Sequence, residues 1–473
     1  MKGLMLATIA RWTEGHLYGP DGLITHICHD TRNDVRDALY VCLHGEHFDG
    51  HQFCAMAAQR GAVGLLLEQR QESVSLGQIV VKNTQIALAQ IAAALQRTRS
   101  TRVFLVTGSN GKTTVKTMLF SILRQWGKAQ QRTVYVNPGN YNNEIGLPIA
   151  VIQAADTADD AVYEMGAGKP GDIAYLLTVV KPSIALVNTI APAHLERLGH
   201  LLGVAETKGA IYAALGADGI AIVNADDAFA QWFIQTRIPP HCRVLRFGIQ
   251  ASAHISARQI STTASATQFH LVAPSGDIPV TIPFGGVHHI RNALAAAAMA
   301  CAAGVSLEAI AQGLAVLEPL PGRQRVHSLP HGITLIDDSY NANMGSVQAA
   351  IDVLAKTTHP WLVLGDMHEL GEKSRQLHAM IGHLARHAGI KRVYTFGPLS
   401  QRAAEAFGPG AVACLQDHTQ LIATLRCDLD VLVAANSSPR AMPTVLIKGS
   451  RASAMDKIVD ALLASHGGDT HVA

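Results

Sequence analysis

The stretch Val103-Phe-Leu-Val-Thr-Gly-Ser-Asn-Gly-Lys-Thr-Thr-Val115 decides how this chain folds. An apolar run of strand length leads into a glycine turn, after which Lys112 and Thr113 open a run compatible with a helix. The backbone N–H groups of such a turn and the start of the helix supply partial positive charge, Lys112 adds a full charge, and the Thr113 hydroxyl can face Mg²⁺. The stretch therefore predicts a cradle for the phosphates of a nucleoside triphosphate.

The loop is a shortened phosphate-loop pattern, because the common form would need a glycine where this chain has Val106. Its residues are the first candidates for binding the nucleotide: Gly108, Ser109, Asn110, Gly111, Lys112, Thr113 and Thr114. The alternative is a chance glycine turn beside an ordinary surface lysine. That alternative leaves the strand before the loop and the helix after it unexplained.

Composition narrows the class of protein. The chain has 473 residues, of which 48% are hydrophobic and 16% charged, with a net charge of +2. This length allows two to four domains, and the charge lacks the basic excess typical of nucleic-acid binding. The seven cysteines show no paired spacing, which is typical of thiols in a reducing compartment, so we expect a cytoplasmic protein.

No targeting or membrane segment is expected. The apolar part of residues 1–7 is too short for a signal peptide. The longest apolar run, residues 293–305, falls short of the roughly 18 residues that span a bilayer. We therefore expect no membrane insertion.

The order of apolar runs predicts the domain organisation. After a first segment with short strands and a helix over 86–96, strand-length runs alternate with helical periodicity at 103–106, 161–163, 184–188 and 220–224. This alternation predicts a mostly parallel sheet covered on both faces. Between about 243 and 284 the pattern alternates and is rich in Thr and Ser, which predicts antiparallel strands before a helix over 290–303.

A third segment repeats the strand and helix pattern, with strands expected at 333–336, 361–364, 392–396 and 431–433. The fold class is therefore α/β with three domains. We expect a small N-terminal α/β domain over 1–98, a central phosphate-loop domain over 99–319 and a C-terminal α/β domain over 320–473.

Polar residues at predicted strand ends are candidates for metal binding. Glu164 ends one such strand, and its carboxylate could share Mg²⁺ with Thr113. His194 follows the next strand and could bind a second ion through its neutral imidazole. The alternatives are a solvated Glu164, a structural His194 and, further on, a Lys208 on a helix surface.

Further motifs follow one another along the chain: Asp30-Thr-Arg32, Asp49-Gly-His51, Gly139-Asn-Tyr-Asn-Asn-Glu-Ile-Gly146, Tyr163-Glu-Met-Gly166, Ala193-His-Leu-Glu196, Asn224-Ala-Asp-Asp227, Pro321-Gly-Arg323, Asp337-Asp-Ser-Tyr-Asn-Ala-Asn343, Leu364-Gly-Asp-Met-His-Glu-Leu-Gly371 and Lys448-Gly-Ser-Arg451. With the phosphate loop, they resemble the Mur ligases over nearly the whole chain. The strings beginning at Asp337 and Leu364 point to the member that adds a dipeptide.

The resemblance implies a reaction and a division of labour. The N-terminal domain would bind the UDP end of the substrate, the central domain would be an ATPase, and the Rossmann-like C-terminal domain would help to clamp ATP and seat the dipeptide. The reaction would join UDP-MurNAc-tripeptide to D-alanyl-D-alanine through an acyl phosphate, with ATP becoming ADP and phosphate. The implied cofactors are ATP and Mg²⁺, and we expect a monomer.

The resemblance also implies residue roles. The catalytic candidates are Lys112 on the β- and γ-phosphates, Glu164 with Thr113 on one Mg²⁺, and His194 on a second ion. Lys208 matches a lysine that the family carbamylates, which would turn an ammonium into a carboxylate-like ligand for the second ion. For the nucleotide, the implied contacts are Asn292 with adenine, Arg323 with phosphates and Asp338 with ribose.

Residues matching the sugar-nucleotide site are Thr31, Arg32, Gly50 and His51, with Asn140, Asn142 and Asn143 near the reacting end. Ordinary turn chemistry is the alternative for each asparagine. The chain departs from the family pattern at His289 and Met344, where Asn and Pro are usual. The segment 435–443 resembles an extra loop, which leaves the seating of the dipeptide open.

Two other classes of function stay open. One is another amide ligase of the superfamily, either a sibling Mur ligase or a folylpolyglutamate-type enzyme, separable by which acceptor stimulates ATP hydrolysis. The other is a phosphate-loop kinase or regulatory nucleotide switch, whose ATP turnover or binding would not respond to any amino acid or dipeptide.

Overall fold

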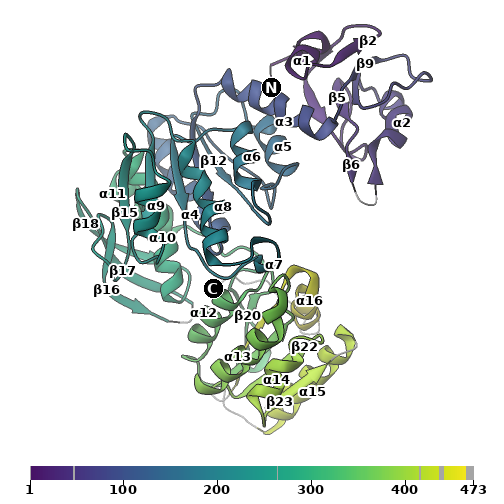
Figure 1. The fold of residues 1–473 in the computed structure, drawn as a ribbon. Helices are drawn as coiled ribbons and strands as arrows, with labels where there is room; N and C mark the ends of the chain where they lie inside the picture. The colour runs from purple at the N-terminus through teal and green to yellow at the C-terminus, as the bar shows by residue number, and fades with distance from the viewer. Residues whose placement is uncertain (1, 46–47, 264, 415–416, 436–441, 465–473) are drawn as a thin grey trace.

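A computed structural model describes residues 2–45, 48–263, 265–414, 417–435 and 442–464 (Figure 1). The chain forms three parts that follow one another from the N-terminal part at the upper right of Figure 1 to the C-terminal part at the bottom. No helix within the described ranges combines the length and the hydrophobicity that crossing a lipid bilayer requires. The segment 435–443, expected as an extra loop, falls mostly on residues 436–441, outside the described residues.

The N-terminal part is built on a sheet in the order β2-β9-β8-β5-β4. Its strands are β2 (His16–Tyr18), β9 (Gly77–Val80), β8 (Gly64–Leu67), β5 (Ala38–Val41) and β4 (His26–Cys28). The short pairs are β1 (Leu4–Met5) with β3 (Leu23–Ile24) and β6 (His44–Gly45) with β7 (Phe48–Asp49). The helices are α1 (Leu6–Trp12), η1 (Gly50–Phe53), α2 (Cys54–Gln59) and α3 (Thr84–Arg97). Helix α3 packs against the central part.

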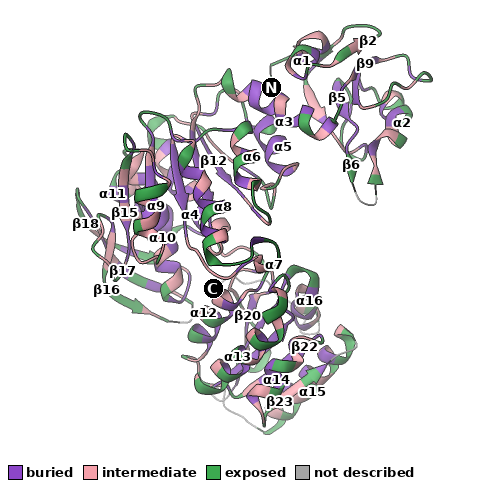
Figure 2. Cartoon of the chain, viewed as in Figure 1, coloured by how far each residue is buried: buried purple, intermediate pink, exposed green. Residues whose placement is uncertain are grey.

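The central part contains a parallel sheet in the order β11-β12-β10-β13-β14-β15. Its strands are β10 (Arg102–Thr107), β11 (Val134–Val136), β12 (Asp160–Glu164), β13 (Ile184–Val187), β14 (Ile220–Asn224) and β15 (Arg243–Phe247). Successive residues of β10 enter opposite cores: Phe104 packs with the helices of one face and Leu105 with those of the other. Figure 2 shows these strands buried. The predicted parallel sheet covered on both faces is confirmed.

Helices cover the two faces of this sheet. One layer consists of α4 (Lys112–Gln130), α10 (Val287–Ala302) and α11 (Leu307–Ala315). The other contains α5 (Gly146–Gln153), α6 (Asp172–Val179) and α8 (Leu201–Ala213), joined by α3. Two short helices, α7 (Leu195–Leu198) and α9 (Ala230–Thr236), complete the connections.

The predicted antiparallel strands lie next to this sheet as β16 (Ser256–Thr262), β17 (Thr267–Ala273) and β18 (Gly276–Ile282). The prediction was wrong at its start, because β15 pairs parallel with β14 instead of joining the antiparallel group. β15 comes directly after α9, so it extends the strand and helix alternation of the parallel sheet by one unit.

The C-terminal part has a second sheet in the order β19-β20-β24-β21-β22-β23, parallel except for the edge strand β19. Its strands are β19 (Arg325–Ser328), β20 (Thr334–Asp338), β21 (Pro360–Gly365), β22 (Arg392–Phe396), β23 (Ala411–Cys414) and β24 (Thr444–Lys448). Its helices are η2 (Pro330–Gly332), α12 (Met344–Leu354), η3 (Gly371–Lys373), α13 (Ser374–His387), α14 (Gln401–Phe407), α15 (His418–Ala435), η5 (Arg451–Ser453) and α16 (Asp456–Ala464).

One predicted strand of this part was wrong. Residues 431–433 lie in α15, whose buried residues Leu421, Leu425 and Leu429 recur every four positions, as one face of a helix requires. Val431 lies outside that stripe and is exposed. The central strand that the prediction missed is β24, which ends at Lys448.

Candidate functional site

The phosphate-loop residues form a tight turn between β10 and α4. Gly111 has a φ of 77°, a left-handed conformation that favours glycine. A Cβ atom at this position would collide with the side chains of Asn188 and Asn292. The Nζ atom of Lys112 donates to the backbone oxygen of Gly108 at 2.9 Å, so the lysine folds back over the loop. This turn has the shape and charge to receive phosphate groups.

A cavity of about 990 Å³ opens over the loop and extends to the third part of the chain. The predicted residues that line it come from both parts: Ser109, Asn110, Gly111, Lys112, Thr113, Thr114, Asn140, Asn142, Asn143, Glu164, His194, Asn292, Arg323 and Asp338. Thr31, Arg32, Gly50, His51, Gly108 and Lys208 do not line it. The loop and the reacting-end asparagines are thus brought together, and the four N-terminal residues are not.

Glu164 is buried at the end of β12, in hydrogen-bonding contact with the loop. Its carboxylate accepts from the Thr113 hydroxyl at 2.9 Å and from the Asn142 amide at 2.8 Å. Burial would raise the pKa of Glu164, but the charges of Lys112 and Lys116 and these hydrogen bonds lower it below its ordinary value. The result is an ionised carboxylate beside a hydroxyl, a pair of hard oxygen donors that fits Mg²⁺.

Among the residues that the structure describes, no three His, Cys, Asp or Glu side chains gather closely enough to hold an ion. His194 stands at the cavity just before α7, and its Nδ1 lies 2.6 Å from Oε2 of Glu369 in the third part. Burial lowers the pKa of His194, which favours the neutral imidazole that metals bind.

Lys208 is buried on α8 with 1% of its surface exposed, so the surface-lysine alternative is wrong. Burial, and then the charge of Lys112, lower the pKa of Lys208 to about 7. About half of a lysine with this pKa is an uncharged amine at pH 7, and the uncharged amine is the form that reacts with carbon dioxide.

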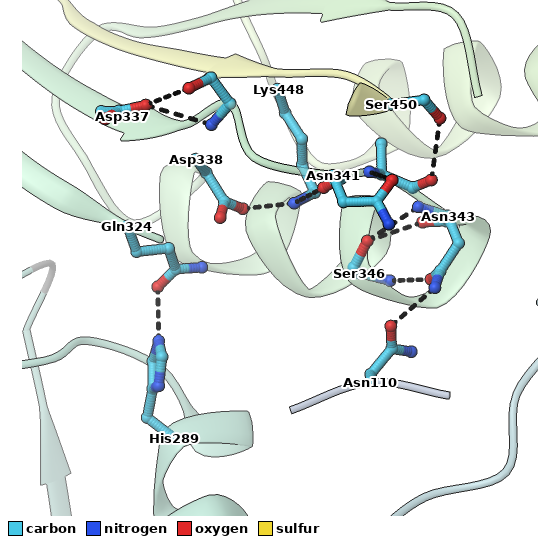
Figure 3. A network of polar contacts seen from close by, with 12 residues as sticks. Asn110, His289, Gln324, Asp337, Asp338, Asn341, Asn343, Ser346, Lys448 and Ser450 are labelled. Carbon is cyan, nitrogen blue, oxygen red and sulfur yellow. Dashed lines mark hydrogen bonds and ion pairs between the residues drawn. The ribbon is translucent and has the colours of Figure 1, made fainter. Parts of the chain in front are cut away.

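Residues of the third part complete the cavity wall (Figure 3). The Arg323 guanidinium donates to the Thr113 hydroxyl at 3.0 Å. Asp338 accepts from the Lys448 ammonium at 2.6 Å, and it lines the cavity, where its carboxylate could accept from hydroxyl donors. The Asn343 amide donates to Oδ1 of Asn110 at 2.7 Å, which links this part directly to the phosphate loop.

Asn292 lies on α10 against the loop, and its Oδ1 accepts from the Asn188 amide at 3.0 Å. The unusual His289, one turn earlier, stacks on Phe284 and lies 3.0 Å from the Gln324 amide oxygen. Burial lowers the pKa of His289 to about 4, so this residue is neutral. The second departure, Met344, is the first residue of α12 and needs no proline, because Asn343 already caps that helix.

The N-terminal candidates are held by local contacts. Arg32 pairs with Asp30 at 2.7 Å on the exposed surface. The His51 ring lies 2.7 Å from Asp49, and its other nitrogen accepts from the Glu68 backbone N–H at 3.0 Å. Thr31 is buried, and a Cβ at Gly50 would press on the Leu43 backbone at 2.9 Å. These contacts hold the loops of the N-terminal part in place. The contacts of Thr31, Arg32, Gly50 and His51 with the sugar nucleotide stay a prediction.

The chain matches the family model described as "Mur ligase middle domain" over residues 106–300 and that described as "Mur ligase, glutamate ligase domain" over 322–451. It is 40% identical over 464 residues to the UDP-N-acetylmuramoyl-tripeptide--D-alanyl-D-alanine ligase of Escherichia coli K12, covering 98% of this chain and 99% of that protein. The chain belongs to the Mur ligase family.

Solved structures agree with this assignment. MurF from Acinetobacter baumannii matches this Mur ligase with a TM-score of 0.90 and 29% identity, covering 98% and 99% of the two chains. MurF ligase from Thermotoga maritima, solved in complex with ADP, matches with a TM-score of 0.80 and 25% identity, covering 93% of this chain and 98% of that one. The resemblance drawn from the sequence motifs is therefore confirmed, as is the three-domain α/β fold.

Sequence reasoning missed several residues of this Mur ligase that touch the predicted site: Lys116, Asn188, Asn343, Glu369 and Lys448. A signal existed for Lys116, which lies four residues after Lys112 and so on the same face of a helix. Asn188 is the last residue of the strand predicted over 184–188. Asn343, Glu369 and Lys448 belong to motifs that carry the family resemblance, but no role was assigned to them singly, because they approach the site from the third domain.

Proposed function

We propose that this Mur ligase joins D-alanyl-D-alanine to UDP-MurNAc-tripeptide with the conversion of ATP to ADP and phosphate, giving UDP-MurNAc-pentapeptide for peptidoglycan synthesis. One observation carries this assignment: the 40% identity to the Escherichia coli ligase of that name extends over nearly the full length of both chains. No part of the chain large enough to form a different substrate domain is left outside the match.

The chemistry requires activation of a carboxylate, because its charge repels nucleophiles and oxide is a very poor leaving group. Attack of the tripeptide carboxylate oxygen on the γ-phosphorus of ATP forms an acyl phosphate and releases ADP. The dipeptide amine then attacks the carbonyl carbon, and phosphate leaves with the original carboxylate oxygen. Each step gathers negative charge on phosphate oxygens, so electrostatic stabilisation is the main task of the site.

The phosphate loop is suited to that task. The loop N–H groups, the start of α4 and the Lys112 ammonium would bind the phosphates, with Ser109, Asn110 and Thr114 lining the same turn. Thr113 and Glu164 fit one Mg²⁺, which would neutralise phosphate charge when bound. The contact of Arg323 with Thr113 supports a place for its guanidinium beside the phosphates.

His194 and a carbamylated Lys208 would hold a second ion, which would add positive charge near the phosphates. The neutral imidazole of His194 and the depressed pKa of Lys208 support this proposal. The nucleoside would extend past Asn292 to Asp338, whose carboxylate faces the cavity and suits the ribose hydroxyls.

For the sugar nucleotide, we propose that Thr31, Arg32, Gly50 and His51 bind the UDP end and that the asparagines near the loop bind the reacting end. Asn142, at 2.8 Å from Glu164, supports the second half of this proposal. The domain limits 1–98, 99–319 and 320–473 belong to the same proposal. We further propose a cytoplasmic monomer, because ATP is kept inside the cell and one chain supplies both the phosphate loop and the third-domain residues that line the cavity.

The test is phosphate release from ATP and Mg²⁺ by the purified protein with UDP-MurNAc-tripeptide, with and without D-alanyl-D-alanine, followed by mass analysis of the product. Release that needs both substrates, with a pentapeptide product, is expected. Equal release without the dipeptide contradicts the proposal. Release stimulated only by a single amino acid or by a folate reassigns the enzyme to another amide ligase, and release that ignores every acceptor indicates a kinase or nucleotide switch.

A further inference from the structure

Lys116 is a buried lysine at the phosphate site that neither the sequence motifs nor the reaction assigns. It lies on α4, one turn after Lys112, with 4% of its surface exposed. Its Nζ donates to the backbone oxygens of Asn137 and Gly139, each at 3.1 Å, and lies 3.5 Å from Oε2 of Glu164. It does not line the cavity, so it has no direct access to a substrate there.

Burying an ammonium is costly unless its donors are satisfied. Here two of the three acceptors belong to one loop, residues 137–143, which carries Asn140, Asn142 and Asn143. Lys116 therefore joins the Glu164 carboxylate to the loop that faces the reacting end of the cavity.

The same loop closes on Glu164 from its other end. The Asn142 amide donates to Oε1 of the carboxylate at 2.8 Å. The Asn137 side chain accepts from the Glu164 backbone N–H at 3.0 Å and donates to the Tyr141 oxygen at 2.8 Å. The carboxylate is thus held by the loop through Asn142 and by Lys116, while Thr113 holds it from the phosphate side at 2.9 Å. A shift of the loop therefore changes the hydrogen bonds that hold the carboxylate.

We propose that Lys116 is a positioning residue that couples loop 137–143 to the Glu164 carboxylate. Through this coupling the loop is held in the shape that binds the sugar nucleotide, and binding of the sugar nucleotide to the loop aligns the carboxylate with the phosphate loop. This inference rests on the proposed function, because the loop's ligand is taken to be UDP-MurNAc-tripeptide. Lys116 acts through Glu164 and the loop and touches no reacting atom.

The test replaces Lys116 with methionine, an unbranched side chain one heavy atom shorter, which removes the charge and the donors. Lys116→Met is expected to raise KM for UDP-MurNAc-tripeptide roughly 10-fold or more and to lower kcat, while KM for ATP stays within about two-fold. Calorimetry with the sugar nucleotide alone, without ATP or Mg²⁺, should show weaker binding by a similar factor. Lys128→Met, an exposed lysine on the same helix, is the matched control and should match the wild type.

Unchanged binding and KM for the sugar nucleotide in a folded Lys116→Met protein would overturn the proposal, as would equal rises of KM for both substrates. If the methionine variant does not fold, Lys116→Gln takes its place. Its amide keeps two donors for buried acceptors but removes the charge that faces Glu164 and shortens the side chain by one atom, so the same split between the two KM values is expected. A wild-type enzyme that makes no pentapeptide refutes the proposed function, whereas an active wild type with an unaffected variant refutes the coupling alone.

Discussion

Lys208 offers the most quantitative prediction, because its environment sets how much of it can react. Carbamylation joins the uncharged amine to carbon dioxide and releases a proton. With a pKa of about 7, roughly three-quarters of Lys208 is uncharged at pH 7.5, against about one part in a thousand for a lysine with the ordinary pKa of 10.5. Burial and the Lys112 charge thus increase the reactive amine several-hundred-fold.

The direction with pH follows from the same pKa. Because the pKa is lowered to about 7, protonation below that value removes the reactive amine, so carbamate occupancy at constant carbon dioxide should fall as the pH drops through 7. The wild-type protein in ¹³C-labelled bicarbonate should show a carbamate carbon signal by NMR with this pH dependence. Lys208→Ala should lose the signal and nearly all activity, and short carboxylic acids should restore part of the activity by supplying the missing anion.

Lys128→Ala, in which an exposed lysine is removed, should keep both the carbamate signal and the activity. The reasoning would be refuted by a wild-type protein without a carbamate signal near pH 8, or by a Lys208→Ala variant with normal turnover. A signal that persists in Lys208→Ala would assign the carbamate to another amine.

Three other substitutions test the site. Lys112→Ala should lower turnover by ~10²–10³-fold, since its charge stabilises phosphoryl transfer, and steady-state kinetics showing near-normal kcat would contradict this role. Gly111→Ala should abolish nucleotide binding measured by calorimetry, because the new methyl group collides with Asn188 and Asn292. An unchanged circular dichroism spectrum would show that the variant still folds, and tight nucleotide binding would refute the argument from the collision. Lys448→Met leaves Asp338 without its ion-pair partner and should lower the free energy of unfolding in urea by about 3–5 kcal/mol; an unchanged urea midpoint would argue against a buried pair.

The central domain could be predicted from the sequence because its signals are local. The apolar runs at 103–106 and 184–188 have strand length, and the glycines before Lys112 predict the turn of a phosphate loop. The strand prediction failed where the local apolar composition of a segment favours one structure and its packing in the folded chain favours another. Residues 431–433 are apolar enough for a strand, but they continue helix α15, which is packed through the buried leucines four residues apart that precede them.

The site was harder to predict than the fold, because its walls meet across long stretches of sequence. Asn343 reaches Asn110 from another domain, and Glu369 reaches His194 in the same way. Burial of Lys208 has no local signature either, since a lysine on a helix is usually exposed. Only the family resemblance singled it out.

The central claim is that the tripeptide carboxylate attacks ATP directly, and isotope transfer tests it most directly. UDP-MurNAc-tripeptide labelled with ¹⁸O in both oxygens of the reacting carboxylate would be converted with unlabelled ATP and D-alanyl-D-alanine, and the released phosphate analysed by mass. The acyl-phosphate route predicts one ¹⁸O atom in each phosphate released. Unlabelled phosphate, or label recovered in AMP, would contradict the account.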